Sequence, residues 1–188
     1  MPDENQSTAE VLPESRCHLL GVVAGPPALR RSGELERVVF GLDCGQDRVV
    51  QVEAPFCRFA LPDDDEVRLG PGAPLVDLPE GAPLEVRGRL QLRPLCVVPV
   101  WTRRLPAPPE TPRVQLETGP LRMEAYARPD RGQREGASLR TATGTVVRAV
   151  LPNNTWVVTG ATVDLAVLPP RRGREQAALY VARLTPLG

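Results

Sequence analysis

The sequence predicts an all-β protein, and three observations support this. The 188 residues include 22 Pro and 16 Gly, which are spread along the whole chain and interrupt long helices. No segment keeps the 3.6-residue hydrophobic period of a helix for more than about three turns. Short runs of alternating apolar and polar residues recur instead, with turn residues about every 8–12 positions, which is typical of a small barrel or sandwich.

The first half of the chain contains five runs that we expect to form strands. They are residues 19–23, 37–44, 50–54, 84–92 and 95–100. The fourth run alternates most clearly and predicts a half-buried antiparallel strand. Its apolar face carries Leu84, Val86, Leu90 and Leu92, and its polar face carries Glu85, Arg87, Arg89 and Gln91. Residues 54–79 lack such a pattern and are expected to hold one short helix or an irregular loop.

A Pro-rich segment divides the chain into two β-rich units. Residues 105–112 read LPAPPETP and are expected to form a stiff, extended linker. After it we expect one or two strands within 114–127, then strands within 139–151, 155–168 and 176–184, with a turn at 152–154. The predicted organisation is a disordered acidic lead over 1–15, a first domain over 16–105, the linker over 106–113 and a second domain over 114–188.

Charge is balanced overall, but all of the basic residues are of one type. The chain has 23 basic and 23 acidic residues, and every basic residue is Arg. Lys and Ile are both missing, which is typical of a GC-rich coding sequence. The balance argues against a uniformly basic nucleic-acid coat and leaves local basic patches open. Guanidinium groups bind phosphates through paired donors and stack on flat rings.

Composition also excludes several classes of protein. Apolar residues make up 41 % of the chain, which is enough for a hydrophobic core and argues against global disorder. No apolar run approaches the roughly 20 residues that a membrane-spanning helix needs. Residues 1–14 have neither the basic nor the apolar region of a signal peptide, so we expect a cytoplasmic, nucleoid-associated protein.

Residues that carry catalysis or bind metals are few and scattered. The four Cys are Cys17, Cys44, Cys57 and Cys96, none of which forms a CxxC pair. We expect them to be buried, reduced thiols, because a zinc site needs clustered ligands. His18 follows Cys17 on a predicted strand, where neighbours point to opposite faces, and this disfavours a Cys-His dyad.

Other catalytic or ligand-binding motifs are also missing from the sequence. The acidic run at 63–66 lacks the Gly and the spacing of a calcium-binding loop and is expected to be a solvated loop. No catalytic triad or phosphate-binding loop motif is present. The sequence therefore predicts a protein that is not an enzyme and that holds no metal or cofactor.

Two segments of the first unit share a layout of Gly, Pro, Arg and apolar residues with a known group of proteins. In residues 21–44, GVVAGPPALRRSGELERVVFGLDC, the key positions are Gly21, Pro27, Arg30, Gly33 and Phe40. In residues 80–93, EGAPLEVRGRLQLR, they are Gly81, Leu84, Val86, Gly88, Leu90 and Arg93. The segments resemble the first hairpin and a late strand of bacterial single-stranded DNA-binding proteins and of primosomal protein B.

The resemblance implies an OB-fold, a five-stranded, partly open barrel that binds oligonucleotides, for about residues 16–105. The second unit matches less well, and a degenerate OB-fold and a simpler sheet both remain open for it. The chain is also similar in length and Arg-only composition to the DNA-damage-response single-strand binders of Deinococcus. That likeness implies a role in the response to DNA damage.

Aromatic residues, on which single-strand binders stack bases, make up only 4 % of the chain. Phe40 lies on the apolar face of its predicted strand and is expected in the core. Phe56 and Phe59 fit either a core or a stacking position. Trp101 and Trp156 are the better candidates for stacking, because Trp101 precedes two Arg residues and Trp156 follows a turn.

Clustered Arg residues complete the predicted nucleic-acid site. The candidates are Arg30, Arg31, Arg37, Arg87, Arg89, Arg93, Arg103, Arg104, Arg171, Arg172 and Arg174. In a barrel, those of the first unit are expected along one groove, where guanidiniums track phosphates and stack on bases. The alternative is that they are ordinary surface charges paired with Glu34, Glu36 and Glu85.

Two functions follow from these observations. The first is a single-stranded DNA-binding protein without sequence preference that acts in DNA repair or the damage response, with repair or replication proteins as further partners. A homodimer is expected, because open sheet edges of such barrels often pair between subunits. The second is an OB-like protein-interaction module that binds no nucleic acid, which the zero net charge and scarce aromatics favour.

Overall fold

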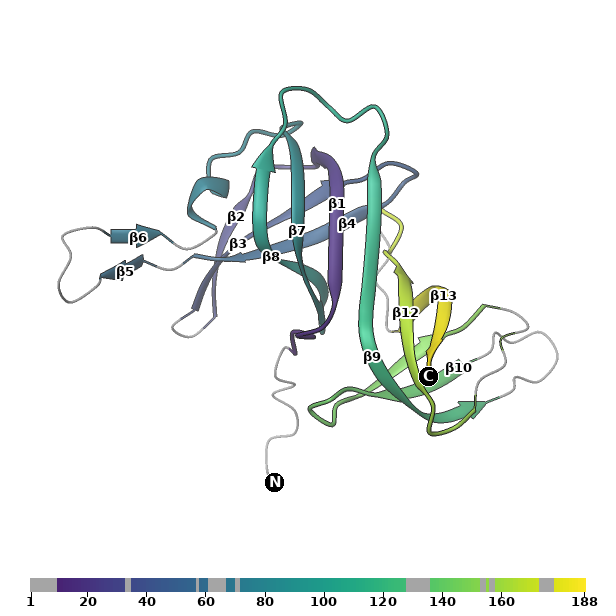
Figure 1. Cartoon of the computed structure of the whole chain (residues 1–188). Coiled ribbons are helices and arrows are strands. Elements are labelled where there is room, and N and C mark those ends of the chain that lie inside the picture. Colours follow the sequence, from purple (N-terminus) through teal and green to yellow (C-terminus); the bar gives the residue numbers. More distant parts are fainter. Residues whose placement is uncertain are drawn as a thin grey trace.

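The computed structural model describes residues 10–32, 35–56, 58–60, 67–69, 72–127, 136–152, 155, 158–172 and 178–188. In these residues the protein is all-β, which confirms the predicted fold class, and the helical structure is a short 3₁₀ turn, η1 (Ala73–Leu75). Figure 1 shows two β-barrels side by side, with the long strand β9 running along their junction. None of the described residues belongs to a helix that is long and apolar enough to cross a membrane.

The first barrel is a closed ring of five strands, here called the first ring. In ring order these are β1 (Arg16–Val23), β3 (Leu35–Asp43), β4 (Val49–Pro55), β8 (Leu95–Arg104) and β7 (Pro83–Leu92). Neighbouring strands are antiparallel except β4 and β8, which are parallel. A further strand, β2 (Ala28–Ser32), pairs with β3. The ring is the five-stranded barrel expected of an OB-like fold.

The second unit is also a ring of five strands, here called the second ring. In ring order these are β9 (Arg113–Ala127), β10 (Gly136–Arg140), β11 (Val146–Val150), β13 (Leu179–Leu187) and β12 (Thr162–Leu168). β11 and β13, the third and fifth strands of this ring in chain order, are again parallel. Counted within each unit, both rings therefore close in the same order, first, second, third, fifth and fourth.

The two rings are joined through their first strands. β1 and β9 pair antiparallel from Arg16 opposite Glu117 to Leu20 opposite Arg113, which makes one 11-stranded sheet. Antiparallel pairing of equivalent strands relates the rings by an approximate two-fold axis. β9 thereby occupies the edge of β1 that β7 leaves open.

Contacts between the rings are reciprocal. The backbone N–H of Arg172, between β12 and β13, donates to the carbonyl of Asp47, in the turn between β3 and β4 (3.0 Å). Arg93, in the turn between β7 and β8, donates from Nη2 to the carbonyl of Val146 where β11 begins (2.7 Å). In each case the connection between the fourth and fifth strands of one ring contacts the connection between the second and third strands of the other. These contacts hold the two rings together.

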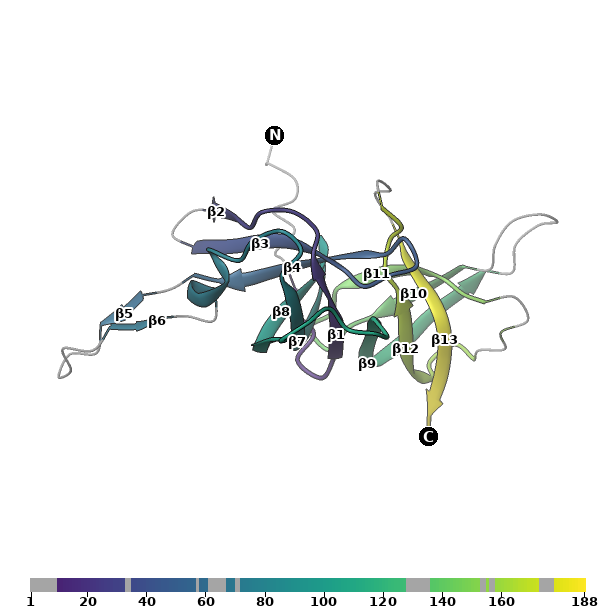
Figure 2. The same ribbon diagram turned by 90° about the horizontal axis from the view of Figure 1, so that it is seen from above.

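Three connecting segments surround the first ring. Residues 10–15 belong to the segment predicted to be a disordered acidic lead, but they lie against β7, where the N–H of Leu12 donates to Leu90 O (2.8 Å). The Pro-rich segment connects β8 to β9 and forms the long loop at the top of Figure 1. A hairpin of β5 (Arg58–Ala60) and β6 (Val67–Leu69) projects away from the barrel (Figure 2). This hairpin and η1 occupy the stretch where a short helix or loop was expected.

The apolar faces of both rings form one continuous core. Its largest fully buried side chains include Leu19, Leu42, Leu84 and Leu90 in the first ring and Leu121, Met123, Leu139 and Leu165 in the second. Phe40 is buried among them, as predicted. Two glycines allow the backbones to approach closely: a Cβ at Gly21 would lie 2.2 Å from Asp43 O, and one at Gly88 would lie 2.3 Å from Val98 O.

Strand boundaries differ from the prediction mainly in the second ring. Residues 139–151 contribute to two strands, β10 and β11, because a turn closed by the N–H of Thr141 and the carbonyl of Thr145 separates them. β12 begins at Thr162 because a turn at 158–161, with Gly160 at a φ of 89°, precedes it. The final strand continues to Leu187, and β9 is one long strand.

Candidate nucleic-acid interface

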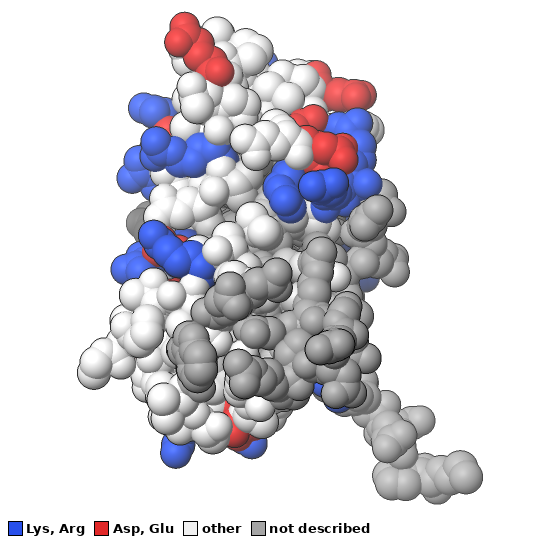
Figure 3. All heavy atoms as spheres, turned by 90° about the vertical axis from the view of Figure 1, so that its right-hand side faces the viewer, with Lys and Arg blue, Asp and Glu red and all other residues white. Residues whose placement is uncertain are grey.

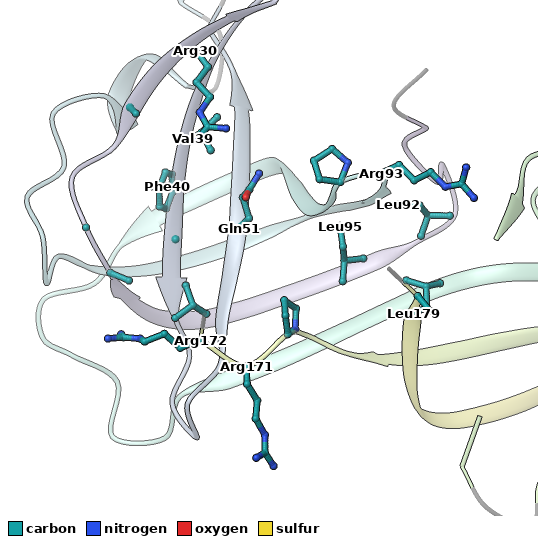
Figure 4. A pocket seen from close by; sticks show the side chains of 18 of the residues that line it. Arg30, Val39, Phe40, Gln51, Leu92, Arg93, Leu95, Arg171, Arg172 and Leu179 are labelled. Carbon is teal, nitrogen blue, oxygen red and sulfur yellow. The ribbon is translucent and has the colours of Figure 1, made fainter. Parts of the chain in front are cut away.

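A groove of about 1030 Å³ lies where the two rings meet, here called the inter-ring groove. From the first unit, β2, β3, β4 and the turn between β7 and β8 line it, and from the second unit, β11 and the segment that leads into β13 line it. Five Arg residues line it, namely Arg30, Arg93, Arg148, Arg171 and Arg172. Figure 4 shows four of them on elements from both rings, with the side chains of Arg93, Arg171 and Arg172 extending outward from Gln51 and Leu95.

Positive charge dominates this groove. The described residues that line it include five Arg and neither Asp nor Glu. Arg172 pairs with Asp43 just outside the groove (3.0 Å). Within the described part of the chain, Arg30, Arg148 and Arg171 make no ion pair, and all three residues are exposed. The groove therefore offers an excess of cationic donors to an anionic ligand.

Two other predicted Arg residues near the groove are ion-paired. Arg31 binds Glu36 (3.0 Å), and its side chain is largely exposed. Arg37 donates from Nη1 to Glu53 Oε2 (3.0 Å) and to Gln91 Oε1 (3.1 Å) and is partly buried. For these two residues, the structure supports the alternative of paired charges. Arg37 stabilises the fold by satisfying two buried polar side chains.

A second group of predicted residues lies on the outside of the first ring. Arg87, Trp101 and Arg103 meet around Glu85, and together with His18 they are here called the outer cluster. Glu85 Oε1 accepts from Arg87 Nη2 (3.0 Å), and Oε2 accepts from Arg103 Nη2 (2.6 Å). His18 Nε2 lies 3.0 Å from Glu85 Oε1. β1, β7 and β8 place these side chains on one sheet face.

Glu85 is the anchor of the outer cluster, and only 3 % of the residue is exposed. Burial by itself raises the pKa of this carboxyl, but hydrogen bonds from Arg103, Arg87 and His18 outweigh burial and hold the pKa below its usual value. Glu85 is therefore ionised at neutral pH. Its charge fixes two guanidiniums that are themselves largely exposed, at 61 % of each side chain.

Trp101 is the aromatic member of the outer cluster. The guanidinium carbons of Arg87 and Arg103 lie 5.3 and 5.6 Å from the centre of its ring, within the range of a cation–π contact. Trp101 nevertheless remains 43 % exposed. It borders a hollow of about 450 Å³ that Arg16 and Arg89 also line.

The structure thus divides the predicted Arg residues between two surfaces instead of aligning them along one groove. Arg30, Arg93, Arg171 and Arg172 belong to the inter-ring groove, and Arg87, Arg89, Trp101 and Arg103 belong to the outer face. Arg104 pairs in register with the buried Leu84 and so points away from the face of Arg103. Figure 3 shows Arg side chains in separate groups on the molecular surface, some with acidic neighbours. Trp156 and Arg174 lie outside the described residues.

Sequence reasoning missed two features of these surfaces. Arg148 lines the groove, yet in the sequence it is a single Arg within an apolar strand, and its alternation with the buried Val147 and Ala149 was the available signal. The sequence offered Glu85 as a partner of surface Arg residues, and Arg87 and Arg103 do bind it. Its burial was missed, because the alternation of β7 predicted an exposed polar side chain. Neighbours from β1 and β8 bury it.

The thiols are buried, as predicted, at the three positions that the structure describes. Cys17, Cys44 and Cys96 are free and buried, and burial raises the pKa of Cys17 and of Cys44 to about 12. These thiols are therefore protonated at neutral pH, and a protonated thiol is a poor nucleophile. Cys57 and the acidic run at 63–66 lie outside the described residues.

Comparison with known proteins yields no family: no family model matches the chain, and no curated protein matches it. The strand order, the inter-ring groove and the outer cluster are therefore the basis for assigning a function.

Proposed function

We propose that this protein binds single-stranded DNA without sequence preference, and that the inter-ring groove is the main contact. The observation that carries the proposal is the lining of the groove by five Arg residues and, among its described residues, no carboxylate. Guanidinium groups hold phosphates through charge-assisted hydrogen bonds, which do not depend on the base sequence. OB-like barrels commonly bind extended single strands in such grooves.

The groove fits a single strand better than a duplex. Its floor contains apolar and polar side chains, among them Val39, Gln51 and Leu95, which can contact exposed bases. In a duplex the faces of the bases are stacked and paired, so they could not lie against these side chains. A role in DNA repair or the damage response, with repair or replication proteins as partners, extends the proposal and rests on the resemblance of the sequence to single-strand binders, including its length and Arg-only composition.

A protein-interaction module without nucleic-acid binding is the second candidate. The observation that favours it is that Arg31, Arg37, Arg87, Arg103 and Arg172 all form ion pairs with carboxylates. Charges that are already paired attract phosphates less strongly. Edge strand β2, beside the exposed Leu29 and Leu35, is the surface on which we expect a homodimer or another partner to dock.

A competition experiment separates these two functions. Fluorescence anisotropy is measured with labelled oligo-dT of increasing length at low salt, followed by competition with unlabelled single strands or duplex of the same length. Single-strand binding predicts affinity that rises with length and competition by single strands far better than by duplex. No binding at low salt, or equal competition by duplex, contradicts the proposal and favours the interaction module.

A further inference from the structure

We infer that the outer cluster is a second, separate contact for single-stranded DNA, in which Trp101 stacks on one base and Arg87 and Arg103 hold the adjoining phosphates. The inference rests on the proposed function, because it assumes that the ligand is a single strand. It adds a site that the groove does not include. A strand that leaves the groove would engage this site only if it is long enough to reach the outer face.

The first argument is that the outer cluster presents an aromatic surface and cations together. Trp101 is 43 % exposed although two guanidiniums lie near its ring. Its neighbour Val100 is also exposed and borders the same hollow. The guanidiniums lie over the ring, so the exposed part of the indole and the guanidinium planes together offer a base a surface to stack on, beside donors for its phosphate.

The second argument is that the cations are held in place before any ligand arrives. Glu85 uses both carboxylate oxygens, one for Arg87 and one for Arg103. Each guanidinium has five N–H donors in a fixed fork, so donors remain free on both after these bonds. Fixing the side chains in advance lowers the entropy lost when a phosphate binds.

The third argument is the balance of charge around the platform. Arg16 and Arg89 line the hollow beside Trp101, and Arg113 lies next to His18. Glu85 is almost fully buried beneath the cluster, so the groups that reach solvent there are mainly cationic. Arg16 is the exception, because Glu117 and Asp164 bind it. This complementarity favours a polyanion over a neutral partner.

Two oligonucleotide lengths and one fluorophore test the inference. The protein used in this experiment has the substitution Trp156→Phe, which leaves Trp101 as its single Trp and therefore as the fluorophore. It is titrated with dT of about 8 nucleotides, the span of one barrel, and of about 30 nucleotides, which exceeds it. We expect the longer strand to quench Trp101 and the shorter strand to bind with little quenching. Trp101→Ala should lower the affinity for the longer strand by about 5- to 150-fold, the range for loss of one stacked base. It should leave the affinity for the shorter strand unchanged.

Controls make each outcome decisive. Trp101→Phe should retain most of the affinity for the longer strand. Arg183→Ala, which removes an exposed Arg from β13, should leave the affinity for both lengths unchanged. Binding of both lengths without quenching of Trp101 overturns the inference and leaves the proposed function intact. Equal losses for both lengths overturn it too, because Trp101 would then belong to the main site. Quenching by an acidic peptide but by no oligonucleotide overturns both proposals in favour of a protein partner.

Discussion

The inter-ring groove and the outer cluster are both rich in Arg, but different groups hold their side chains. In the groove, Arg30, Arg148 and Arg171 make no ion pair with any described residue. In the outer cluster, the buried Glu85 binds both Arg87 and Arg103. The groove therefore offers more uncompensated charge, and the outer cluster offers a more rigid arrangement.

Because of this difference, we expect the two surfaces to contribute to binding in different ways. Uncompensated guanidiniums release counterions when they meet phosphates, which makes groove binding strong at low salt and weak at high salt. A fixed platform contributes through stacking, which depends little on salt. Affinity for short strands should then follow the groove, and additional affinity for long strands should follow the outer cluster.

The largest expected effect comes from removing the uncompensated charge of the groove. The triple variant Arg30→Ala, Arg148→Ala, Arg171→Ala should bind oligo-dT about 100-fold more weakly at low salt. The slope of log affinity against log salt should become shallower by about 2, because each single-strand phosphate contact contributes about 0.7. Anisotropy titrations over a series of salt concentrations measure both quantities.

The matched control for this variant is Arg122→Ala, in which an exposed Arg of β9 that lines neither surface is removed. It should leave the affinity and the salt slope close to those of the unmodified protein. A triple variant with an unchanged slope would contradict the assignment of the groove as the main phosphate contact.

The next effect concerns the anchor of the outer cluster. Glu85→Gln removes the charge to which two Arg residues bind and leaves a buried amide with poorer partners. We expect the free energy of unfolding to fall by about 1–2 kcal/mol, since the exposed guanidiniums can regain water. Urea unfolding measures it, and Glu36→Gln, which removes a more exposed carboxylate bound to the exposed Arg31, should cost less than about 1 kcal/mol. Equal losses would mean that Glu85 has no special structural role.

Much of the fold could be predicted from the sequence, because alternation reports which face of a strand is buried. Leu84, Val86 and Leu90 are buried as predicted. Alternation could not show that Glu85 and Gln91, on the other face, are buried too, since strand β1 and residues 10–12 cover them from distant parts of the chain.

The candidate site was harder to predict than the fold. Clusters of Arg in the sequence suggested one groove, but sequence neighbours such as Arg103 and Arg104 point to opposite faces of β8. The inter-ring groove depends on the pairing of β1 with β9 and on contacts between turns of different rings. Such long-range contacts leave no local pattern, which is why Arg148 was not singled out.

A smaller effect is expected from pH at the outer cluster. Because the pKa of Glu85 lies below its usual value of 4.5, its stabilising bonds are present above about that pH and are lost as the pH falls through the lowered pKa. The fluorescence of Trp101 in the Trp156→Phe protein should therefore change in acid, below pH 4.5. The additional Glu85→Gln substitution should abolish this change. A transition that persists in that variant would assign it to another group.

The smallest effect is expected at the rim of the groove. Arg172→Ala breaks an ion pair with Asp43 in which both side chains are substantially exposed. Such pairs contribute about 0–1 kcal/mol, so the free energy of unfolding should change by less than about 1 kcal/mol. Thermal or urea unfolding measures this change. A larger loss would show that the contact between the two rings depends on this side chain.

The central claim is that guanidiniums of the inter-ring groove hold the phosphates of a single strand. The most direct test is the salt dependence of oligo-dT binding by the unmodified protein, measured by fluorescence anisotropy. If all five Arg residues of the groove contact phosphates, the slope of log affinity against log salt should be roughly −3.5. A slope near zero, or no binding at low salt, would contradict the claim.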